Sequence, residues 1–295
     1  MSGKDDPVII EDIMKFLDNV LTDFIERAPD SFSDATYAAM RERSVGLGVM
    51  GFHSFLQKHS IPIESVMAKV WNNKMFKQID TEVNAASKKL AAERGACPDA
   101  ADYGIMERFS NKTAIAPTAS ISIICGGASP GIEPVAANSY THKTLSGSFN
   151  VRNRYLKELL AKYEKDTDEV WSSITTNQGS VMHLDFLSDH EKDVFKTAFE
   201  IDQRWLIDHS ADRTPYISQA QSLNVFLPAD VHKRDLHQIH FQAWKKGLKS
   251  LYYCRSKSIQ RAEVINQTVA NAKKNQPAAS SNGEAANYEE CLSCQ

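Results

Sequence analysis

The sequence is poor in cysteine, with five cysteines among 295 residues. This number is odd and too small to hold a chain of this length together, which excludes a disulfide-based scaffold. We therefore expect reduced or catalytic thiols. The nine histidines also lack a metal-binding spacing. Three of them fall on one predicted helix, where packing or solvation is the simpler role, so the sequence predicts no metal site.

An excess of charge of one sign is lacking as well. The chain has 34 Lys and Arg residues against 37 Asp and Glu residues, which argues against a general nucleic-acid or membrane-surface binder. No apolar run approaches the roughly 18 residues that span a bilayer, and residues 1–7 contain no apolar signal core. With 42% hydrophobic residues, we expect a cytoplasmic protein of one large domain or two small ones.

What the sequence does contain is an alternation of helical and strand patterns typical of an α/β fold. Apolar residues recur at three- and four-residue spacing through Val8–Arg27, which predicts an amphipathic helix. A longer helix is expected over 63–94, ended by Gly95. Further strands are expected at 113–116, 222–227 and 248–254, further helices at 151–165, 189–209 and 230–247, and a turn-rich stretch at 138–150.

The stretch 111–134 carries almost no charge, since Lys112 and Glu133 are its only charged residues. Small hydroxyl, Gly and Pro residues among isoleucines suit a buried backbone loop. Hydroxyls and free amides at 118–120 can cradle an anion such as a phosphate without a basic side chain. The simpler alternative is an ordinary helix N-cap made by Thr118 or Ser120.

From residue 266 onward the sequence is polar and cannot bury enough apolar surface to order itself. We therefore predict a flexible tail over 266–295, with Cys291 and Cys294 near its tip. Two thiols at this spacing can close a disulfide or supply half of a zinc site. The tail holds no histidine and no second cysteine pair to complete a zinc site, which leaves a mobile dithiol.

Several motifs together resemble one family. They are Pro-Thr-Ala-Ser-Ile-Ser at 117–122, Gly-Ile-Glu-Pro at 131–134, Arg-Ser-Val-Gly-Leu-Gly-Val-Met-Gly-Phe at 43–52, Gly-Ala-Cys-Pro at 95–98, Tyr-Ile-Ser-Gln-Ala-Gln-Ser-Leu-Asn at 216–224 and Trp-Lys-Lys-Gly-Leu-Lys at 244–249. In this order they resemble the large (α) subunit of class I ribonucleotide reductases. The resemblance covers essentially the whole chain but corresponds to the C-terminal part of a family subunit.

This resemblance implies that 1–265 form the second half of a ten-stranded α/β barrel, completed by an N-terminal half. The assembled enzyme would reduce ribonucleoside diphosphates to deoxyribonucleotides by a radical mechanism. No cofactor is expected in this chain, because the resemblance places a diiron-tyrosyl radical in a small (β) subunit and nucleotide effectors on the N-terminal partner. The family's substrate-phosphate loop corresponds here to Pro117, Thr118, Ala119, Ser120 and Ile121.

The resemblance also assigns roles to two residue pairs. Adjacent tyrosines in a strand, such as Tyr252 and Tyr253, are usually packing residues. In the family, consecutive tyrosines at this motif pass an oxidising equivalent from the small subunit to the catalytic cysteine. Cys291 and Cys294 match the family's C-terminal pair, which re-reduces the active-site disulfide and is itself reduced by thioredoxin or glutaredoxin.

Parts of the family's chemistry are missing from the sequence. The thiyl-forming cysteine of the family is flanked by Asn and Glu, and no Asn-x-Cys-x-Glu pattern occurs here. The two substrate-reducing cysteines have no counterpart either, and Cys97 is expected to be structural. We therefore expect a large subunit split into two polypeptides, a plausible arrangement for a bacteriophage gene whose product works in the host cytoplasm. The alternative is a catalytically silent interaction subunit that binds the small subunit.

Overall fold

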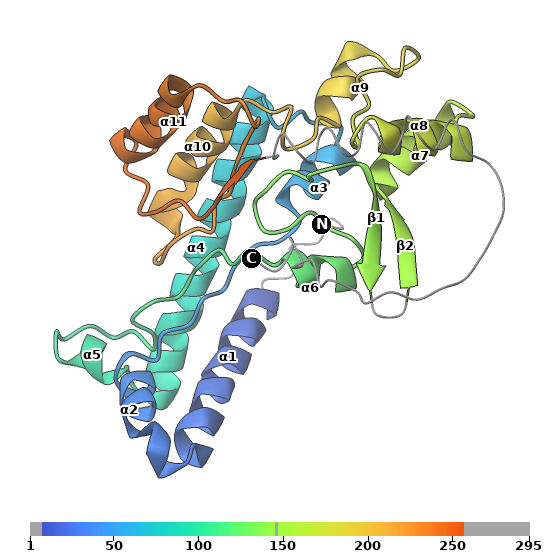
Figure 1. The fold of residues 1–295 in the computed structure, drawn as a ribbon. Helices are drawn as coiled ribbons and strands as arrows, with labels where there is room; N and C mark the ends of the chain where they lie inside the picture. The colour runs from blue at the N-terminus through green and yellow to red at the C-terminus, as the bar shows by residue number, and fades with distance from the viewer. Residues whose placement is uncertain (1–7, 145–146, 257–295) are drawn as a thin grey trace.

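A computed structural model describes residues 8–144 and 147–256 of the chain, and helices make up most of it (Figure 1). The helices are α1 (Val8–Arg27), α2 (Ser33–Glu42), α3 (Phe52–Lys58), α4 (Val66–Arg94), α5 (Pro98–Ala101), α6 (Ala119–Ile124), α7 (Arg154–Lys162), α8 (Asp168–Thr176), α9 (Asp189–Val194), α10 (Gln203–Arg213) and α11 (Lys233–Lys245), with 3-10 turns at Asp30–Phe32 and Thr214–Tyr216. The strands are β1 (Ser139–Thr144), β2 (Gly147–Arg152), β3 (Val225–Leu227) and β4 (Cys254–Ser256).

Four extended segments run parallel to one another through the centre of the molecule. Leu47 pairs with Thr113 and Ile115 with Gln221, in each case through an isolated parallel bridge. β3 then pairs with β4, also in parallel. The order is therefore 45–47, 113–115, 219–227 and 252–256, with helices in the connections, as in an α/β barrel. Within the described ranges, pairing stops at 45–47 on one side and at β4 on the other.

The strands predicted at 113–116 and 222–227 are thus present at the expected places but are shorter than the sequence indicated. The strand predicted at 248–254 is displaced, because β4 covers Cys254–Ser256 and shares only Cys254 with it. The expected strand at 113–116 forms only bridges, and the one at 222–227 is regular only over Val225–Leu227. Glycine explains part of this irregularity: a side chain at Gly48 would place its Cβ 2.4 Å from the carbonyl oxygen of Ala114. The two segments approach too closely there for any residue but glycine.

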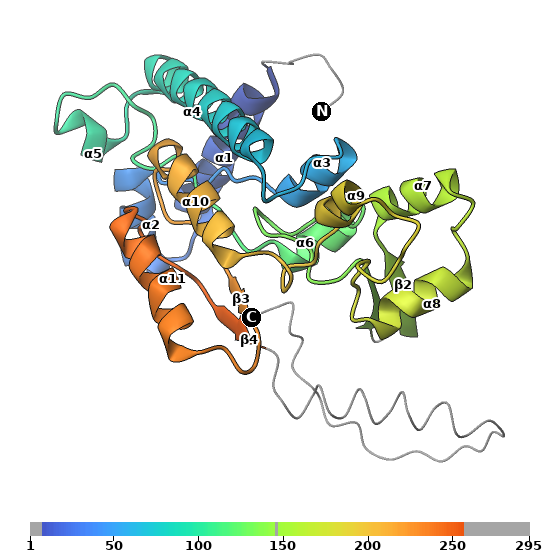
Figure 2. The same ribbon diagram turned by 90° about the horizontal axis from the view of Figure 1, so that it is seen from above.

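The main core lies between these segments and the helices α3, α4, α10 and α11. It is made of aliphatic and aromatic side chains from these four helices, from the two middle segments and from the loops beside them: Phe52, Leu56, Ile63, Ala68, Phe76, Ile115, Ile132, Ile201, Leu206, Ile207, Ile217, Leu223, Val225, Leu227, Ile239 and Ala243. In both views α10 and α11 lie at one side of the molecule and α7, α8 and the β1–β2 hairpin at the other, with α6 between them (Figures 1 and 2).

Helix α1 has the predicted bounds, but its buried face differs from the one that the apolar pattern suggested. Met14 is fully buried against α4, and Ile10, Leu17 and Leu21 pack beside it. The other apolar positions form a second stripe that is exposed in the described part of the chain: Ile9, Ile13, Phe16, Val20 and Phe24. One helix therefore carries one covered and one uncovered apolar face.

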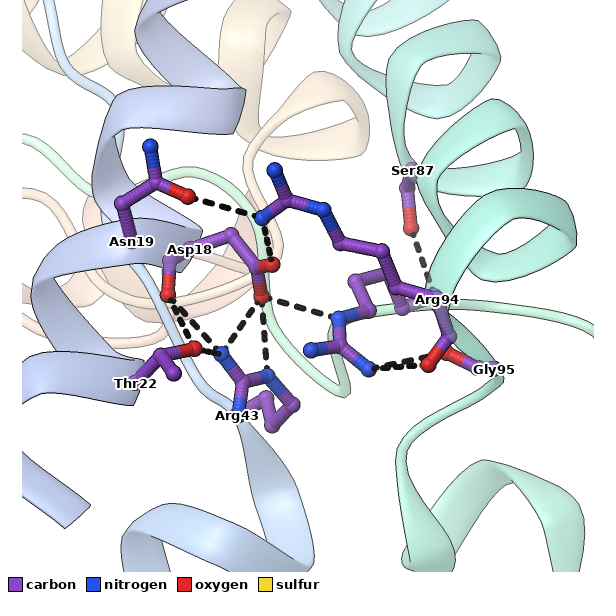
Figure 3. A network of polar contacts seen from close by, with 8 residues as sticks. Asp18, Asn19, Thr22, Arg43, Ser87, Arg94 and Gly95 are labelled. Carbon is purple, nitrogen blue, oxygen red and sulfur yellow. Dashed lines mark hydrogen bonds and ion pairs between the residues drawn. The ribbon is translucent and has the colours of Figure 1, made fainter. Parts of the chain in front are cut away.

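A cluster of charged side chains ties α1 to α4 and to the first central segment (Figure 3). Asp18 is fully buried on α1, and its carboxylate accepts hydrogen bonds from Arg43 Nε at 2.8 Å and Arg94 Nη1 at 2.7 Å. Arg108 Nε donates to the same carboxylate at 2.8 Å. Burial acts to raise the pKa of Asp18, but these three guanidinium groups outweigh it and hold the pKa below its usual range. One buried anion thus joins three separate segments.

The stretch 138–150, expected to be turn-rich, is instead an antiparallel hairpin of β1 and β2. The polar composition of this stretch gave no strand signal, and none of its described side chains, at 139–141 and 150–152, belongs to the main core. Asn138 fixes its start, donating from Nδ2 to the carbonyl oxygens of Gly179 at 3.0 Å and Phe195 at 2.7 Å. This tertiary anchor overrides the local turn propensity.

The single helix predicted over 189–209 is wrong, because the chain forms α9 and α10 with an irregular stretch between them. The Phe195 carbonyl accepts from Asn138, and the Ala198 amide donates to the Val135 carbonyl at 2.8 Å. Both backbone groups are therefore used outside the helix. Periodicity cannot reveal such competition, because the competing partners are distant in sequence.

The long helix expected over 63–94 is confirmed in its main part as α4. It begins three residues later, after Ser65, whose hydroxyl accepts from the Ala68 amide at 3.1 Å. It ends at Gly95, which has a φ of 88° and so takes a conformation that other residues rarely adopt. The sequence did not predict four of the helices, α2, α3, α5 and α8.

Candidate functional site

The loop around α6 is closed by a hydrogen bond that the sequence did not indicate. Thr118 precedes α6 with a φ of 52° and makes no side-chain cap on that helix. Its Oγ1 instead accepts a hydrogen bond from the Gly131 amide at 2.7 Å. The N-cap alternative for Thr118 is therefore wrong. A hydroxyl that accepts one bond still has its own proton to donate, so Thr118 remains able to bind an anion.

Helix α3 holds the other side of this loop in place. The Ser54 hydroxyl accepts from the Ser129 amide at 2.8 Å, and the Ser54 amide donates to the Ser129 hydroxyl at 3.1 Å. Further along the loop, the Val135 amide donates to His53 Nδ1 at 3.1 Å. Burial lowers the pKa of His53 to about 3, so its ring stays neutral and can accept this bond. The part of the loop that follows α6 is thus fixed to α3 by buried polar contacts.

A cleft of about 680 Å³ opens between this loop, the β1–β2 hairpin and the ends of the central segments. Pro117 and Ala119 line it, whereas Thr118, Ser120 and Ile121 are not among its lining residues within the described ranges. The structure therefore brings two of the five predicted phosphate-loop residues to the cleft wall. Its polar lining includes Glu133, Asn138, Arg152, Asn153, Asn224 and Arg255.

Glu133 is the buried acid of this cleft, with 5% of its surface exposed. One carboxylate oxygen accepts from the Asn224 backbone amide at 2.9 Å and the other from Asn224 Nδ2 at 3.0 Å. Burial raises the pKa of Glu133, and the bonds from Asn224 and the positive charge of Arg255 offset only part of that effect. The sequence reasoning gave Glu133 no role, although it is one of only two charged residues in its loop.

The two tyrosines stand beside this cleft at the outer edge of the central segments. Their ring centroids are 4.2 Å apart, and Tyr252 and Tyr253 are 46% and 43% exposed. The Tyr252 amide donates to the Leu223 carbonyl at 2.9 Å, and the Tyr253 amide donates to Asn224 Oδ1 at 3.2 Å. The neighbouring phenol of Tyr253 raises the pKa of Tyr252. Both rings are therefore accessible at the surface of the described part of the chain.

The arginine that follows completes the tyrosine site. The Arg255 guanidinium lies 5.7 Å from the ring centroid of Tyr253, within the range of a cation–π contact. The same side chain lines the cleft next to Glu133. The edge strand β4 therefore begins beside two phenols and contributes a cation that touches both the cleft and the tyrosine pair.

The cysteines differ in their environments. Cys97 is buried, while Cys125 and Cys254 are exposed free thiols. Cys291 and Cys294 lie outside the described residues. In residues 8–144 and 147–256, no group of three His, Cys, Asp or Glu side chains could hold a metal ion. No helix in that part of the chain is long and apolar enough to cross a membrane.

Comparison with known proteins identifies the fold. The family described as "Ribonucleotide reductase, barrel domain" matches residues 5–103 and 98–254. The chain belongs to this ribonucleotide reductase family. The motif-based resemblance is therefore confirmed, and the α/β barrel class with it.

Individual relatives agree with this family. The ribonucleoside-diphosphate reductase large subunit of Invertebrate iridescent virus 6 is 49% identical over 267 residues, which are 89% of this chain and 28% of that protein. The putative large subunit of Frog virus 3 is 38% identical over 290 residues, 97% of this chain and 48% of that protein. A solved class Id ribonucleotide reductase α subunit from Actinobacillus ureae superposes with a TM-score of 0.80 at 39% identity, over 87% of this chain and 47% of its own. The chain thus spans less than half of each of these relatives.

Proposed function

We propose that this chain is the C-terminal part of a ribonucleoside-diphosphate reductase large subunit. Together with the remaining part of that subunit and a radical-generating small subunit, it reduces ribonucleoside diphosphates to deoxyribonucleotides. The observation that carries this proposal is the half-exposed tyrosine pair, joined by Asn224 to a cleft that Pro117 and Ala119 line. A radical path has to begin at a surface and end at a substrate, and this arrangement connects the two.

In this proposal Tyr252 and Tyr253 carry the oxidising equivalent inward. Each phenol gives up a proton and an electron together and later recovers both. The short separation of the two rings supports transfer within the pair. The radical originates at a metal cofactor in the small subunit, which we expect to be a diiron-tyrosyl centre. The thiyl cysteine, the substrate-reducing cysteines and the nucleotide-effector sites belong to the remaining part of the large subunit.

The loop around α6 holds the substrate phosphates. Backbone amides at 119–121, the Thr118 hydroxyl and the Ser120 hydroxyl donate to phosphate oxygens, and Pro117 and Ile121 shape the loop. The bonds that hold the loop at Thr118, Ser129 and Val135 support this role, because pre-positioned donors lose little entropy on binding. Cys291 and Cys294 then return electrons to the active-site disulfide and receive them from thioredoxin or glutaredoxin.

Two features support assembly with the remaining part of the subunit. Central segment 45–47 has no further strand partner in the described ranges, so its outer backbone groups can pair with another strand. The second apolar stripe of α1, with Phe16 64% exposed, offers a face for a further helix. A barrel completed on this side covers both. Assembly takes place in the cytoplasm, or in the host cytoplasm if a phage encodes the chain.

Reconstitution tests this proposal. The chain is purified with a small subunit, with and without a polypeptide that supplies the remaining part of the large subunit, and reduction of cytidine diphosphate is measured with thioredoxin. We expect turnover only in the three-component mixture. Turnover without the remaining part would contradict the proposal. Binding of the small subunit with no turnover in any mixture would instead identify a silent interaction subunit.

A further inference from the structure

The substrate loop and the tyrosine pair are connected by a short chain of buried hydrogen bonds. Glu133 belongs to the loop and lines the cleft. Its carboxylate accepts from both the backbone amide and Nδ2 of Asn224, and Asn224 Oδ1 accepts from the amide of Tyr253. Only one residue therefore stands between the acid of the cleft and the backbone of a tyrosine.

The chemistry of these groups allows one arrangement. Asn224 presents two donors to Glu133, so two acceptors are needed, and an ionised carboxylate supplies both. With Nδ2 directed at Glu133, the amide oxygen of Asn224 has to face the other way, toward Tyr253. Glu133 and Asn224 are 5% and 3% exposed, so water cannot readily replace a lost partner. Glu133 thus sets the orientation of the Asn224 amide, and that orientation provides the acceptor for Tyr253.

We propose that Glu133 and Asn224 are positioning residues that couple the substrate loop to the tyrosine pair. This inference rests on the proposed function for its consequence in turnover. A shift of the loop moves Glu133, changes the hold on Asn224, and so changes the position of Tyr253 relative to Tyr252. A loop held in its bound position therefore favours the tyrosine geometry in which the radical passes inward.

Paired substitutions can separate this coupling from simple stability. In Glu133→Gln one acceptor oxygen becomes an NH2 donor, which faces either the backbone amide or Nδ2 of Asn224, donor against donor. In Asn224→Asp a carboxylate oxygen faces Glu133, acceptor against acceptor. The double variant Glu133→Gln/Asn224→Asp restores one donor and one acceptor at each contact while keeping both side-chain sizes. Each single change should thus break the link, and the double change should re-form it.

The first measurement uses the chain by itself and requires no turnover. Hydrogen exchange at the Tyr253 amide reports directly on its bond to Asn224. We expect exchange on the order of 10-fold faster in each single variant and a return to near the parent rate in the double variant. Equal exchange in all four proteins would overturn the proposal, whether or not the protein proves to be a reductase.

The second measurement uses the assembled enzyme with cytidine diphosphate. We expect kcat to fall on the order of 10- to 100-fold in each single variant, because small misplacements of reacting groups are costly. KM should change by less than about three-fold, and the double variant should recover most of kcat. A loss confined to KM, or no recovery in the double variant, would refute the coupling. An inactive parent enzyme would refute the proposed function and leave the exchange result to decide on the link.

A matched control distinguishes an effect on the tyrosine pair from a general loss of stability caused by altering any buried amide. Gln221 is also a buried amide, and it bonds with Ser210 and Thr214 in α10 and its end rather than with the tyrosines. Gln221→Glu should lower the melting temperature as the single link variants do, yet leave exchange at Tyr253 and kcat near the parent values. If Gln221→Glu changed both in the same way as Glu133→Gln, general destabilisation would explain the effects and the proposal would fail.

Discussion

Replacement of Asp18 by Asn should destabilise the chain more than any exposed charge substitution. Asp18 has no exposed surface, and its carboxylate is the shared acceptor for Arg43, Arg94 and Arg108. Asn keeps the shape but removes the charge and turns one acceptor into a donor. The variant therefore leaves three guanidinium groups close together with no anion among them.

The burial of the arginines sets the size of the effect. The Arg43 side chain is only 8% exposed and Arg108 is 11% exposed, while Arg94 at 30% can still reach water. Breaking a buried ion pair from one side costs about 3–5 kcal/mol, because the remaining charge stays buried. Arg94 can be hydrated after the anion is lost, so the three arginines do not each add a full ion-pair free energy to the loss of stability. We expect a loss of about 3–5 kcal/mol, which for a chain of this size corresponds to a fall in Tm of roughly 6–20 °C.

Thermal and urea unfolding of Asp18→Asn, followed by circular dichroism, test this estimate. The matched control is Asp23→Asn, because Asp23 lies on the same helix but pairs with Arg27 in solvent. That exposed pair should contribute no more than about 0.5 kcal/mol. A loss below about 1 kcal/mol for Asp18→Asn would refute the view that this carboxylate holds three segments together.

The same cluster has a defined dependence on pH. The folded-state pKa of Asp18 is depressed, so its contribution to stability is present above the unfolded pKa of about 3.9. It is lost as the pH falls through the lower folded pKa. The difference in stability between the parent chain and Asp18→Asn should therefore be constant at neutral pH and shrink in acid below about pH 4. A difference that stayed constant down to the lowest pH at which the chain folds would contradict this assignment.

Three further predictions concern the proposed reaction. Thr118→Val should leave the Gly131 amide without its acceptor and remove a phosphate donor, so the dissociation constant for the substrate should rise by about 10-fold or more in the assembled enzyme. The control Thr118→Ser keeps the hydroxyl and should bind substrate normally. Equal affinities of the two variants would show that the hydroxyl has no role. Tyr252→Phe and Tyr253→Phe should each abolish turnover with an unchanged melting curve, because phenylalanine packs like tyrosine but has no phenolic proton; near-normal activity in either would return that residue to a packing role. Replacement of Cys291 and Cys294 by Ser should permit one round of reduction, stop later rounds with thioredoxin, and allow partial recovery with a small dithiol; sustained thioredoxin-driven turnover would show that the pair is dispensable.

The helices that the sequence predicted best are those whose signals are local. Helix α1 has regular apolar spacing, and α4 has a capping serine at one end and Gly95 at the other. Those signals act within a few residues, so they do not depend on the tertiary contacts of the helix. The face that each helix buries is not a local property. On α1 the buried stripe includes Met14 and Leu17, whereas Ile13, Phe16 and Val20 remain exposed.

Where the sequence failed, a distant polar partner decided the structure. Asn138 takes the Phe195 carbonyl and helps to end α9, and the Ala198 amide pairs with Val135 instead of continuing a helix. The same residue, Asn138, anchors the hairpin that the sequence did not predict. One buried asparagine thus contributes to two wrong predictions, because the bonds from its Nδ2 join residues more than 40 positions apart.

In the candidate site, too, local motifs were recognised from the sequence and distant contacts were not. Motifs were enough to select Pro117, Ala119 and the tyrosine pair, since these lie in long strings that resemble one family. They gave no reason to connect Glu133 with Asn224, which are separated by 91 positions and meet only because the central segments run side by side. The strength of this contact comes from burial and from the match of two donors to two acceptors, neither of which a linear pattern records. A motif can therefore select candidate segments, but the contact between them is seen only in the fold.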